Sequence, residues 1–301
     1  MELYHLRTFV TVAEEQHLTR ASERLFTSQP AISAHIKALE EELGVTLFER
    51  TPRGMQLTPA GALLLDRARQ ALAAAGDFLQ HARSIKDELI GTLRIGLNTD
   101  ACFLRLLELQ GGLSERHPRL EIEFHAGSTG ANIPALRVGK LDASFVSGEC
   151  DDPLLESYVL CEEELAVAVP ERMRESIGPA DIHALARHPW VFTSPDCAYY
   201  GVMRALFEAH DCAPVKTVMA NQDDALRTMV AGGVGLGILR RVDIEEAAKS
   251  APIYALPLEL PTVSLRFAHL RTRANDPVIR AAVAELSRVW SLALPVQEQA
   301  V

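Results

Sequence analysis

The 301-residue chain lacks the long apolar runs, paired cysteines and signal sequence that mark membrane and secreted proteins. No hydrophobic run approaches the roughly 18 residues of a membrane-spanning helix, and residues 1–5 have no signal-peptide character. The five cysteines are scattered and odd in number, so we predict no disulfide framework. We therefore expect a cytoplasmic protein that contacts no membrane.

Signatures of catalysis, cofactor binding and metal binding are also missing. There is no nucleophile elbow and no phosphate-binding loop, and the glycines of residues 233–237 are not spaced as a dinucleotide fingerprint. The ten histidines and five cysteines show no metal-ligand spacing. We predict a protein that is not an enzyme and that holds no metal or cofactor.

Positive charge is scarce, although the overall composition is that of a globular protein. The 40 Asp and Glu outnumber the 30 Lys and Arg, which gives a formal net charge of −10. Residues 1–60 contain six Lys and Arg against eight Glu. Counterion release on nucleic acid depends on cations at the contact face and not on the total. This balance therefore allows DNA binding but predicts modest non-specific affinity.

Residues 28–44 carry the clearest local pattern. Ser28 is a suitable N-cap, Pro30 is tolerated in a first helical turn, and Gly44 suits a C-terminal stop. Four apolar residues recur at steps of four and three, which places them on one stripe of a helix: Ile32, Ile36, Leu39 and Leu43. The pattern predicts an amphipathic helix.

The polar face of this helix begins with the amide of Gln29, the hydroxyl of Ser33 and the cation of Lys37. Such side chains are suited to reading base edges and contacting phosphates. An ordinary amphipathic surface helix would show the same pattern. The neighbouring segments therefore decide between the two interpretations.

A second predicted helix lies directly upstream, at residues 18–26, with Ala21, Leu25 and Phe26 expected to face inward. A connection of very few residues joins it to the helix at 28–44. Two helices joined so closely, the second with a polar leading face, are typical of a helix-turn-helix.

A β-hairpin wing is predicted downstream, at residues 48–57, with Arg50 and Arg53 flanking its turn. We expect these arginines to hold the DNA backbone or the minor groove. The residues that we predict to contact DNA are Ser28, Gln29, Pro30, Ser33, Lys37, Arg50 and Arg53.

The first sixty or so residues follow a known family pattern almost without gaps. The residues that carry it are Phe9, Ala13, Ala21, Leu25, the run Ser-Gln-Pro-Ala-Ile-Ser at 28–33, Leu39, Glu40, Leu43, Gly44, the run Leu-Phe-Glu-Arg at 47–50 and the run Leu-Thr-Pro-Ala-Gly at 57–61. They resemble the winged helix-turn-helix of LysR-type transcriptional regulators. One departure is Ala34, where many members carry a long polar residue, which argues against a base contact from this position. The resemblance implies a sequence-specific, double-stranded DNA-binding regulator.

A long helix is predicted over residues 59–91. Apolar residues from Leu64 to Ala82 alternate at spacings of four and three, which forms a heptad-like seam. The seam could pack on its own domain or against a second subunit. The resemblance implies a linker helix that pairs two subunits into a homodimer, and a homotetramer built from such dimers.

Beyond residue 92 the pattern changes to alternating strands and helices, which predicts a parallel sheet with helices on both faces. The resemblance implies an effector-binding domain of two lobes, like a periplasmic binding protein. The predicted fold class is thus a multidomain α/β protein. We expect a DNA-binding domain at 1–58, the linker helix at 59–91, and an effector-binding domain at 92–295. Lobe I comprises about 92–161 and 267–295, and lobe II about 162–266.

A small-molecule effector is expected between the lobes, because the carboxyl ends of strands and the helix N-termini that follow them form a crevice there. Hydroxyls and amides in these turns favour a ligand that carries a carboxylate or a similar acceptor. Asp100 argues against a purely anionic ligand, and could instead be a helix cap or bind an amine. The predicted effector-binding residues, each of which could equally be structural, are Asn98, Thr99, Asp100, Ser128, Thr129, Thr193 and Asn221.

A thiol-based redox sensor is the alternative function. Cys197 and Cys212 flank a predicted helix of lobe II, and peroxide-sensing members of the family use two cysteines in this region. The spacing here is longer and the residues around Cys197 differ, so idle or buried thiols are favoured. A transport-type binding protein would explain only residues 92–295.

Overall fold

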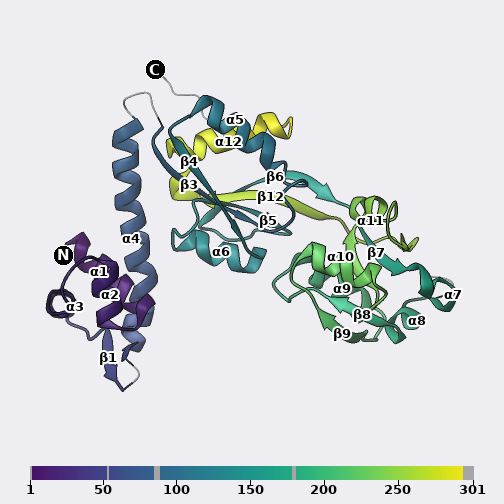
Figure 1. Ribbon diagram of the computed structural model, residues 1–301, viewed down its shortest axis with the longest axis horizontal. Helices are drawn as coiled ribbons and strands as arrows, with labels where there is room; N and C mark the ends of the chain where they lie inside the picture. Colours follow the sequence, from purple (N-terminus) through teal and green to yellow (C-terminus); the bar gives the residue numbers. More distant parts are fainter. Residues whose placement is uncertain (1, 53, 85–88, 178–180, 294–301) are drawn as a thin grey trace. The chain divides into compact units, whose positions relative to one another are not determined.

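The structure is a computed structural model that describes residues 2–52, 54–84, 89–177 and 181–293 (Figure 1). Contacts divide the chain into two compact units, Met1–Glu88 with Arg137–Lys140 and Leu89–Leu136 with Leu141–Val301. Among the described residues, no helix combines the length and the apolarity that crossing a membrane requires. Arg53 and the side chains of Leu79 and Ala82, which we named from the sequence, lie outside the described part.

The first unit is a winged helix-turn-helix followed by a long helix. Its elements are α1 (Leu3–Glu15), α2 (Leu18–Arg24), α3 (Gln29–Leu43), β1 (Phe48–Thr51), β2 (Gly54–Leu57) and α4 (Pro59–Ser84). Ile32, Ile36 and Leu39 of α3 are buried with Phe9 of α1, as the apolar stripe predicts. Ser28 caps α3 by accepting a hydrogen bond from Ala31 N, and Gly44 ends the helix in the left-handed conformation.

Phe26 corrects one sequence-based prediction, because it faces solvent and not the core. It is 97% exposed and has a φ of +50°. Helix α2 ends at Arg24, so Phe26 lies in the turn, where the chain must reverse within a few residues. A positive φ costs energy for a side chain with a Cβ, and it points this ring away from the helices.

The seam on α4 is used largely within its own chain. Ala68 is buried in the core of the first unit, and Leu64 and Leu72 pack against that core. Among the described side chains of α4, the large apolar ones that are exposed are Leu63, at 78%, and Phe78, at 74%. The periodicity therefore identified the helix correctly, but its seam covers α1, and other residues are left for a partner.

Lobe I of the second unit is built on a five-stranded sheet in the order β4-β3-β5-β12-β6. Its elements are β3 (Gly91–Leu97), α5 (Leu106–Arg116), β4 (Leu120–Ala126), α6 (Thr129–Arg137), β5 (Ala143–Ser147), β6 (Leu155–Glu163), β12 (Val263–Leu270), a short 3-10 turn (Arg271–Arg273) and α12 (Pro277–Val289). Strands β3, β4 and β5 are parallel, as predicted. The prediction of a parallel sheet was incomplete, because β12 is antiparallel to both β5 and β6. The chain leaves lobe I along β6 and returns along β12, so the two crossing strands run in opposite directions.

Lobe II contains two small sheets, in the orders β10-β7-β11 and β8-β9. Its elements are β7 (Leu165–Pro170), a 3-10 turn (Glu171–Met173), α7 (Arg174–Ile177), α8 (Ile182–Arg187), β8 (Pro189–Phe192), α9 (Ala198–Glu208), β9 (Val215–Met219), α10 (Asp223–Ala231), β10 (Gly237–Arg240), α11 (Arg241–Ala247) and β11 (Ile253–Ala255). The lobe has its own core around Trp190, Phe207 and Leu236. Figure 1 shows β6 and β12 leading between the two lobes of the second unit.

Two candidate binding sites

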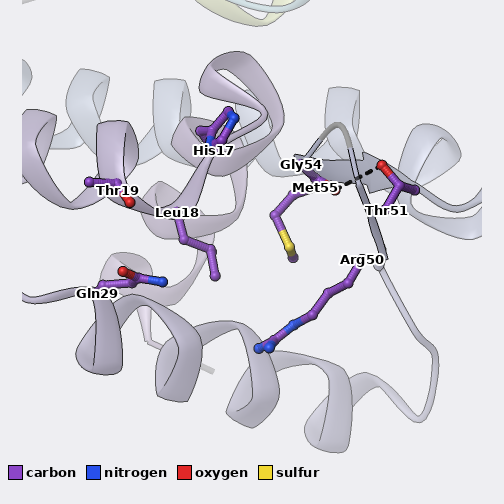
Figure 2. A pocket seen from close by; sticks show the side chains of 8 residues that line it. All are labelled: His17, Leu18, Thr19, Gln29, Arg50, Thr51, Gly54 and Met55. Atoms are coloured by element: carbon purple, nitrogen blue, oxygen red, sulfur yellow. Dashed lines mark hydrogen bonds between the residues drawn. The ribbon is translucent and has the colours of Figure 1, made fainter.

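An open groove lies between the polar start of α3 and the wing (Figure 2). Gln29 is exposed at the first turn of α3, and Arg50 extends from β1 toward the same helix. Arg50 Nη2 donates a hydrogen bond to Ser33 Oγ at 3.2 Å. Thr19 of α2 lines the groove beside Gln29. An amide, a hydroxyl and a guanidinium thus converge on one exposed face.

The other residues predicted for this face occupy their expected places on α3. Ser28 caps the helix, and Pro30 is exposed in its first turn. Lys37 is exposed and lies 3.5 Å from Glu41 in a pair that is open to solvent. Such a pair contributes little to stability, so the ammonium can exchange Glu41 for a phosphate at small cost.

Glu40 holds the wing against α3, which the sequence did not indicate. Its Oε1 accepts hydrogen bonds from Leu47 N at 2.6 Å and Phe48 N at 3.2 Å. A carboxylate that accepts two backbone amides fixes the start of β1 relative to the helix.

The second site is an enclosed cavity between the lobes of the second unit. Asn98, Thr99 and Ser128 line it from lobe I, and Thr193 and Asn221 line it from lobe II. Its volume is only about 30 Å³. A water molecule needs roughly 10–15 Å³ by such a measure, so this cavity has room for about two waters. The lobes are therefore nearly closed on each other here.

Six of the seven residues predicted to bind an effector line this cavity. They are the five residues named above and Thr129. Asp100 is not among the lining residues. Its Oδ1 accepts from Phe103 N at 2.8 Å, and its Oδ2 accepts from Arg240. Burial alone would raise the pKa of Asp100, but these two hydrogen bonds hold it below the ordinary value.

Arg240 joins the two lobes, and sequence reasoning missed this role. Its side chain is 2% exposed at the end of β10 in lobe II. Nη1 donates to Thr99 Oγ1 at 3.0 Å, Nη2 donates to Asp100, and Nε donates to Asp243 Oδ2 at 2.7 Å. The guanidinium carbon lies 3.9 Å from the centre of the Phe103 ring. One buried cation therefore binds two residues of lobe I that follow β3.

Two further buried carboxylates lie at this junction. Asp223, at the start of α10, accepts a hydrogen bond from Thr99 of the opposite lobe. Glu163, at the end of β6, accepts from Ser147 Oγ at 2.7 Å and from Tyr199. Burial raises the pKa of both carboxyls above their ordinary values, despite these donors. The closed cleft is thus rich in carboxyl groups.

A larger, open cavity of about 400 Å³ adjoins the enclosed one. Thr129, Ser147, Cys197 and Ala198 line both, so the two cavities lie side by side. The size of the larger cavity is within the range of small-molecule sites.

Cys197 and Cys212 lie at opposite ends of α9. The 11 residues of this helix rise by about 16 Å at 1.5 Å per residue. A disulfide requires Cα atoms roughly 4.4–6.8 Å apart, so bridging would require α9 to unwind. Burial raises the pKa of the Cys197 thiol, which disfavours the reactive thiolate. The geometry favours the ligand cleft over a redox centre. No group of His, Cys, Asp or Glu among the described residues is arranged to hold a metal ion.

Comparison with known proteins gives a family match for each of the two parts of the chain. Residues 3–62 match the family described as the bacterial regulatory helix-turn-helix protein, lysR family, and residues 86–291 match the LysR substrate binding domain. The chain is 32% identical over 254 residues to the uncharacterized HTH-type transcriptional regulator YnfL of Escherichia coli (strain K12), covering 82% of this chain and 86% of that protein. It is 30% identical over 269 residues to the uncharacterized HTH-type transcriptional regulator YusT of Bacillus subtilis (strain 168), covering 89% of each.

A full-length structure of OxyR from Pseudomonas aeruginosa is similar over 99% of both chains, with a TM-score of 0.70 and 26% sequence identity. These matches together span most of the chain. The protein is a transcriptional regulator, and it belongs to the LysR family of helix-turn-helix proteins.

Proposed function

We propose that this protein binds a specific operator as an oligomer and that a small molecule between the lobes of its second unit controls that binding. The observation that carries the proposal is the enclosed cavity in which residues of both lobes meet, on the same chain as an exposed recognition helix. Its function then rests on binding and not on catalysis. Because its target is chromosomal DNA, we place the protein in the cytoplasm.

DNA is proposed to contact the groove between α3 and the wing. Gln29 and Ser33 are assigned to base edges, because they project from the first two turns of α3. Arg50 and Lys37 are assigned to the phosphate backbone. Selection of operators from genomic DNA with the full-length protein, followed by footprinting, tests this function directly. A protein that retained no preferred sequence would contradict it.

Dimerisation is proposed to use the exposed apolar residues of α4. Leu63 and Phe78 face solvent in the single chain, although burying such side chains is favourable by about 1.5–3 kcal/mol each. We expect light scattering at micromolar concentration to give a dimer or a tetramer. Leu63→Glu combined with Phe78→Glu should reduce the assembly, because two carboxylates would be buried at the interface.

Val242→Glu is the matched control for this experiment. Val242 is also an exposed apolar residue, but it lies on α11 of lobe II. It should leave the assembly unchanged. A monomeric wild-type protein that still bound its operator tightly would contradict the proposed dimer.

Control by an effector is proposed to act through Thr99. Its hydroxyl donates to Asp223 and accepts from Arg240, so it joins lobe I to two groups of lobe II. A ligand that binds one lobe arrangement better than another shifts the population by its differential affinity. A few kcal/mol is enough, since each 1.4 kcal/mol is about tenfold in the equilibrium.

Thr99→Val should leave operator affinity near the wild-type value and abolish the response to an effector. The effector would first be found by a thermal-shift screen of a metabolite panel on the full-length protein. Thr92→Val is the matched control, since Thr92 is on β3, the strand that precedes Thr99, and its hydroxyl donates to Glu121. Loss of operator binding with effector affinity intact would show that Thr99 only supports the fold.

A further inference from the structure

The charges of the side chains that line the enclosed cavity, called the inner cavity below, indicate which chemical class of molecule it accepts. Asp223 is the one Asp or Glu among the described residues that line it, and none of these residues is Lys, Arg or His. Tyr199 also lines it, and burial holds the pKa of its phenol well above the ordinary value, so it stays neutral. A ligand entering this cavity therefore meets one negative charge and no cation.

The nearby guanidinium does not supply the missing positive charge. Arg240 already binds Asp100 and Asp243, and its Nη2 is 4.0 Å from Asp223. Glu163 adds a further carboxyl directly behind Ser147 and Tyr199. Four carboxyls thus surround one cation, and a ligand with two or more negative charges would be repelled.

The lobe I side of the cavity offers hydroxyl donors. Ser128 Oγ accepts from Ala131 N at 3.2 Å, and Thr129 Oγ1 accepts from Ser147 N at 3.0 Å. Because backbone amides already occupy these oxygens as acceptors, each O–H remains available to donate into the cavity. Two neighbouring hydroxyl donors at the start of α6 suit one carboxylate.

The cavity also contains an acceptor that no described residue satisfies. Asn98 Nδ2 donates to Ser147 Oγ at 2.7 Å, but Asn98 Oδ1 is buried and has no hydrogen-bond partner in the described part of the chain. A buried acceptor of this kind is costly unless a donor reaches it. Asn98 Oδ1 and Asp223 are therefore two acceptors for the same ligand.

We propose that the effector is a small zwitterion, an α-amino acid or a close analogue. Its ammonium group binds Asp223 and Asn98 Oδ1, and its carboxylate accepts from Ser128 and Thr129. The inference rests on the proposed function of the cleft and names the chemistry that the cleft selects. It keeps the carboxylate that the sequence favoured, and it places the contact with an amine at Asp223 and not at Asp100.

The closed form of the cleft adds a reason for the ammonium. The inner space of about 30 Å³ is too small for an amino acid while Thr99 of lobe I is bonded to Asp223 of lobe II. The ligand must therefore replace the Thr99 hydroxyl at this carboxylate. An ammonium carries a full positive charge, which the Thr99 hydroxyl lacks, so its hydrogen bond to the Asp223 carboxylate is also an ion pair and can displace the hydroxyl. The side chain of the amino acid then extends into the outer cavity of about 400 Å³.

Calorimetry and thermal shift on the full-length protein test this proposal with matched probes. The probes are the twenty proteinogenic L-amino acids, the desamino acid of each (propionate for alanine), the corresponding amine (ethylamine for alanine), and a set of dicarboxylates, aromatic acids and sugars. We expect at least one amino acid to bind, and its desamino acid and its amine to bind at least about tenfold more weakly.

Asp223→Asn is the diagnostic variant. Asparagine keeps the shape and can still accept from Thr99, but it removes the charge, so amino-acid affinity should fall by about tenfold or more. Asp224→Asn is the matched control, because Asp224 is the next residue of α10, is exposed, and does not line the cavity. It changes the net charge equally and should leave binding unchanged.

Three results would contradict the proposal that the effector is a zwitterion. These are equal binding of an amino acid and its desamino acid, unchanged amino-acid affinity in Asp223→Asn, and binding of no amino acid at all. In the last case, a dicarboxylate, an aromatic acid or a sugar that bound and altered operator affinity would leave the proposed function standing. If no compound of any class bound, both the zwitterion proposal and the proposed control by an effector would be contradicted.

Discussion

Replacing Arg273 by methionine should lower the free energy of unfolding of the second unit by about 3–5 kcal/mol. Arg273 lies in the 3-10 turn that follows β12 and is 6% exposed. Nη1 donates to Asp142 Oδ1 at 2.5 Å, and Nη2 donates to Asp276 Oδ2 at 2.6 Å. Methionine fills similar space but leaves two buried carboxylates without their cation.

The same residues hold other parts of lobe I in place, which is why a large effect is expected. Asp142 Oδ2 accepts from Arg94 N of β3, and Asp276 Oδ1 accepts from Val278 N and caps α12. Chemical denaturation followed by circular dichroism and by tryptophan fluorescence would measure the change. Trp290 belongs to the core of lobe I, so its signal reports this lobe.

Arg204→Met is the matched control for charge removal. Arg204 pairs with Glu208 at 3.5 Å, and both side chains are 64% exposed. An exposed pair contributes at most about 1 kcal/mol, so this variant should be nearly as stable as the wild type. If both variants lost the same free energy of unfolding, the buried contacts of Arg273 with Asp142 and Asp276 would contribute no more to stability than an exposed ion pair.

Replacing Gln29 by alanine should weaken operator binding by about tenfold to a hundredfold, while binding to random DNA stays nearly unchanged. A bidentate contact between an amide side chain and a base is worth about 1–3 kcal/mol of discrimination. Gln29 is exposed at the start of α3 and opens onto the groove that Arg50 and Thr19 also line. Fluorescence anisotropy with operator and scrambled duplexes, at several salt concentrations, would measure both affinities.

Arg50→Ala should behave differently, because a guanidinium that contacts phosphate has no sequence preference. We expect weaker binding to both duplexes and a salt dependence shallower by about one unit of slope. Gln110→Ala on α5 is the control for loss of an exposed glutamine. If Gln29→Ala weakened both duplexes equally, Gln29 would be a phosphate contact and its assignment to base edges would be wrong.

The state of the cleft explains how the second unit can respond to a small molecule. Thr99, Arg240 and Asp223 bond the lobes together beside the inner cavity. A ligand that separates these groups must change the lobe arrangement, because the cavity has no other room for it. Regulation then follows from competition for the same carboxylate.

Local patterns in the sequence were sufficient to place the recognition helix and the cleft residues. The apolar stripe of Ile32, Ile36 and Leu39 is visible because the period of a helix determines which residues are buried. Asn98 and Ser128 were found because turns after parallel strands meet at one edge of a sheet. Both rules depend only on residues that are near one another in the chain.

Tertiary structure alone decided the polar contacts between distant segments. Arg240 bonds Asp100 across 140 residues, and no local pattern indicates which acid a given arginine will reach. The same holds for β12, whose antiparallel pairing follows from the return of the chain from lobe II. It also holds for α4, whose apolar face turned out to cover α1. A sequence records which side chains prefer burial or a partner, but which partner each one finds depends on the three-dimensional meeting of segments far apart in the chain.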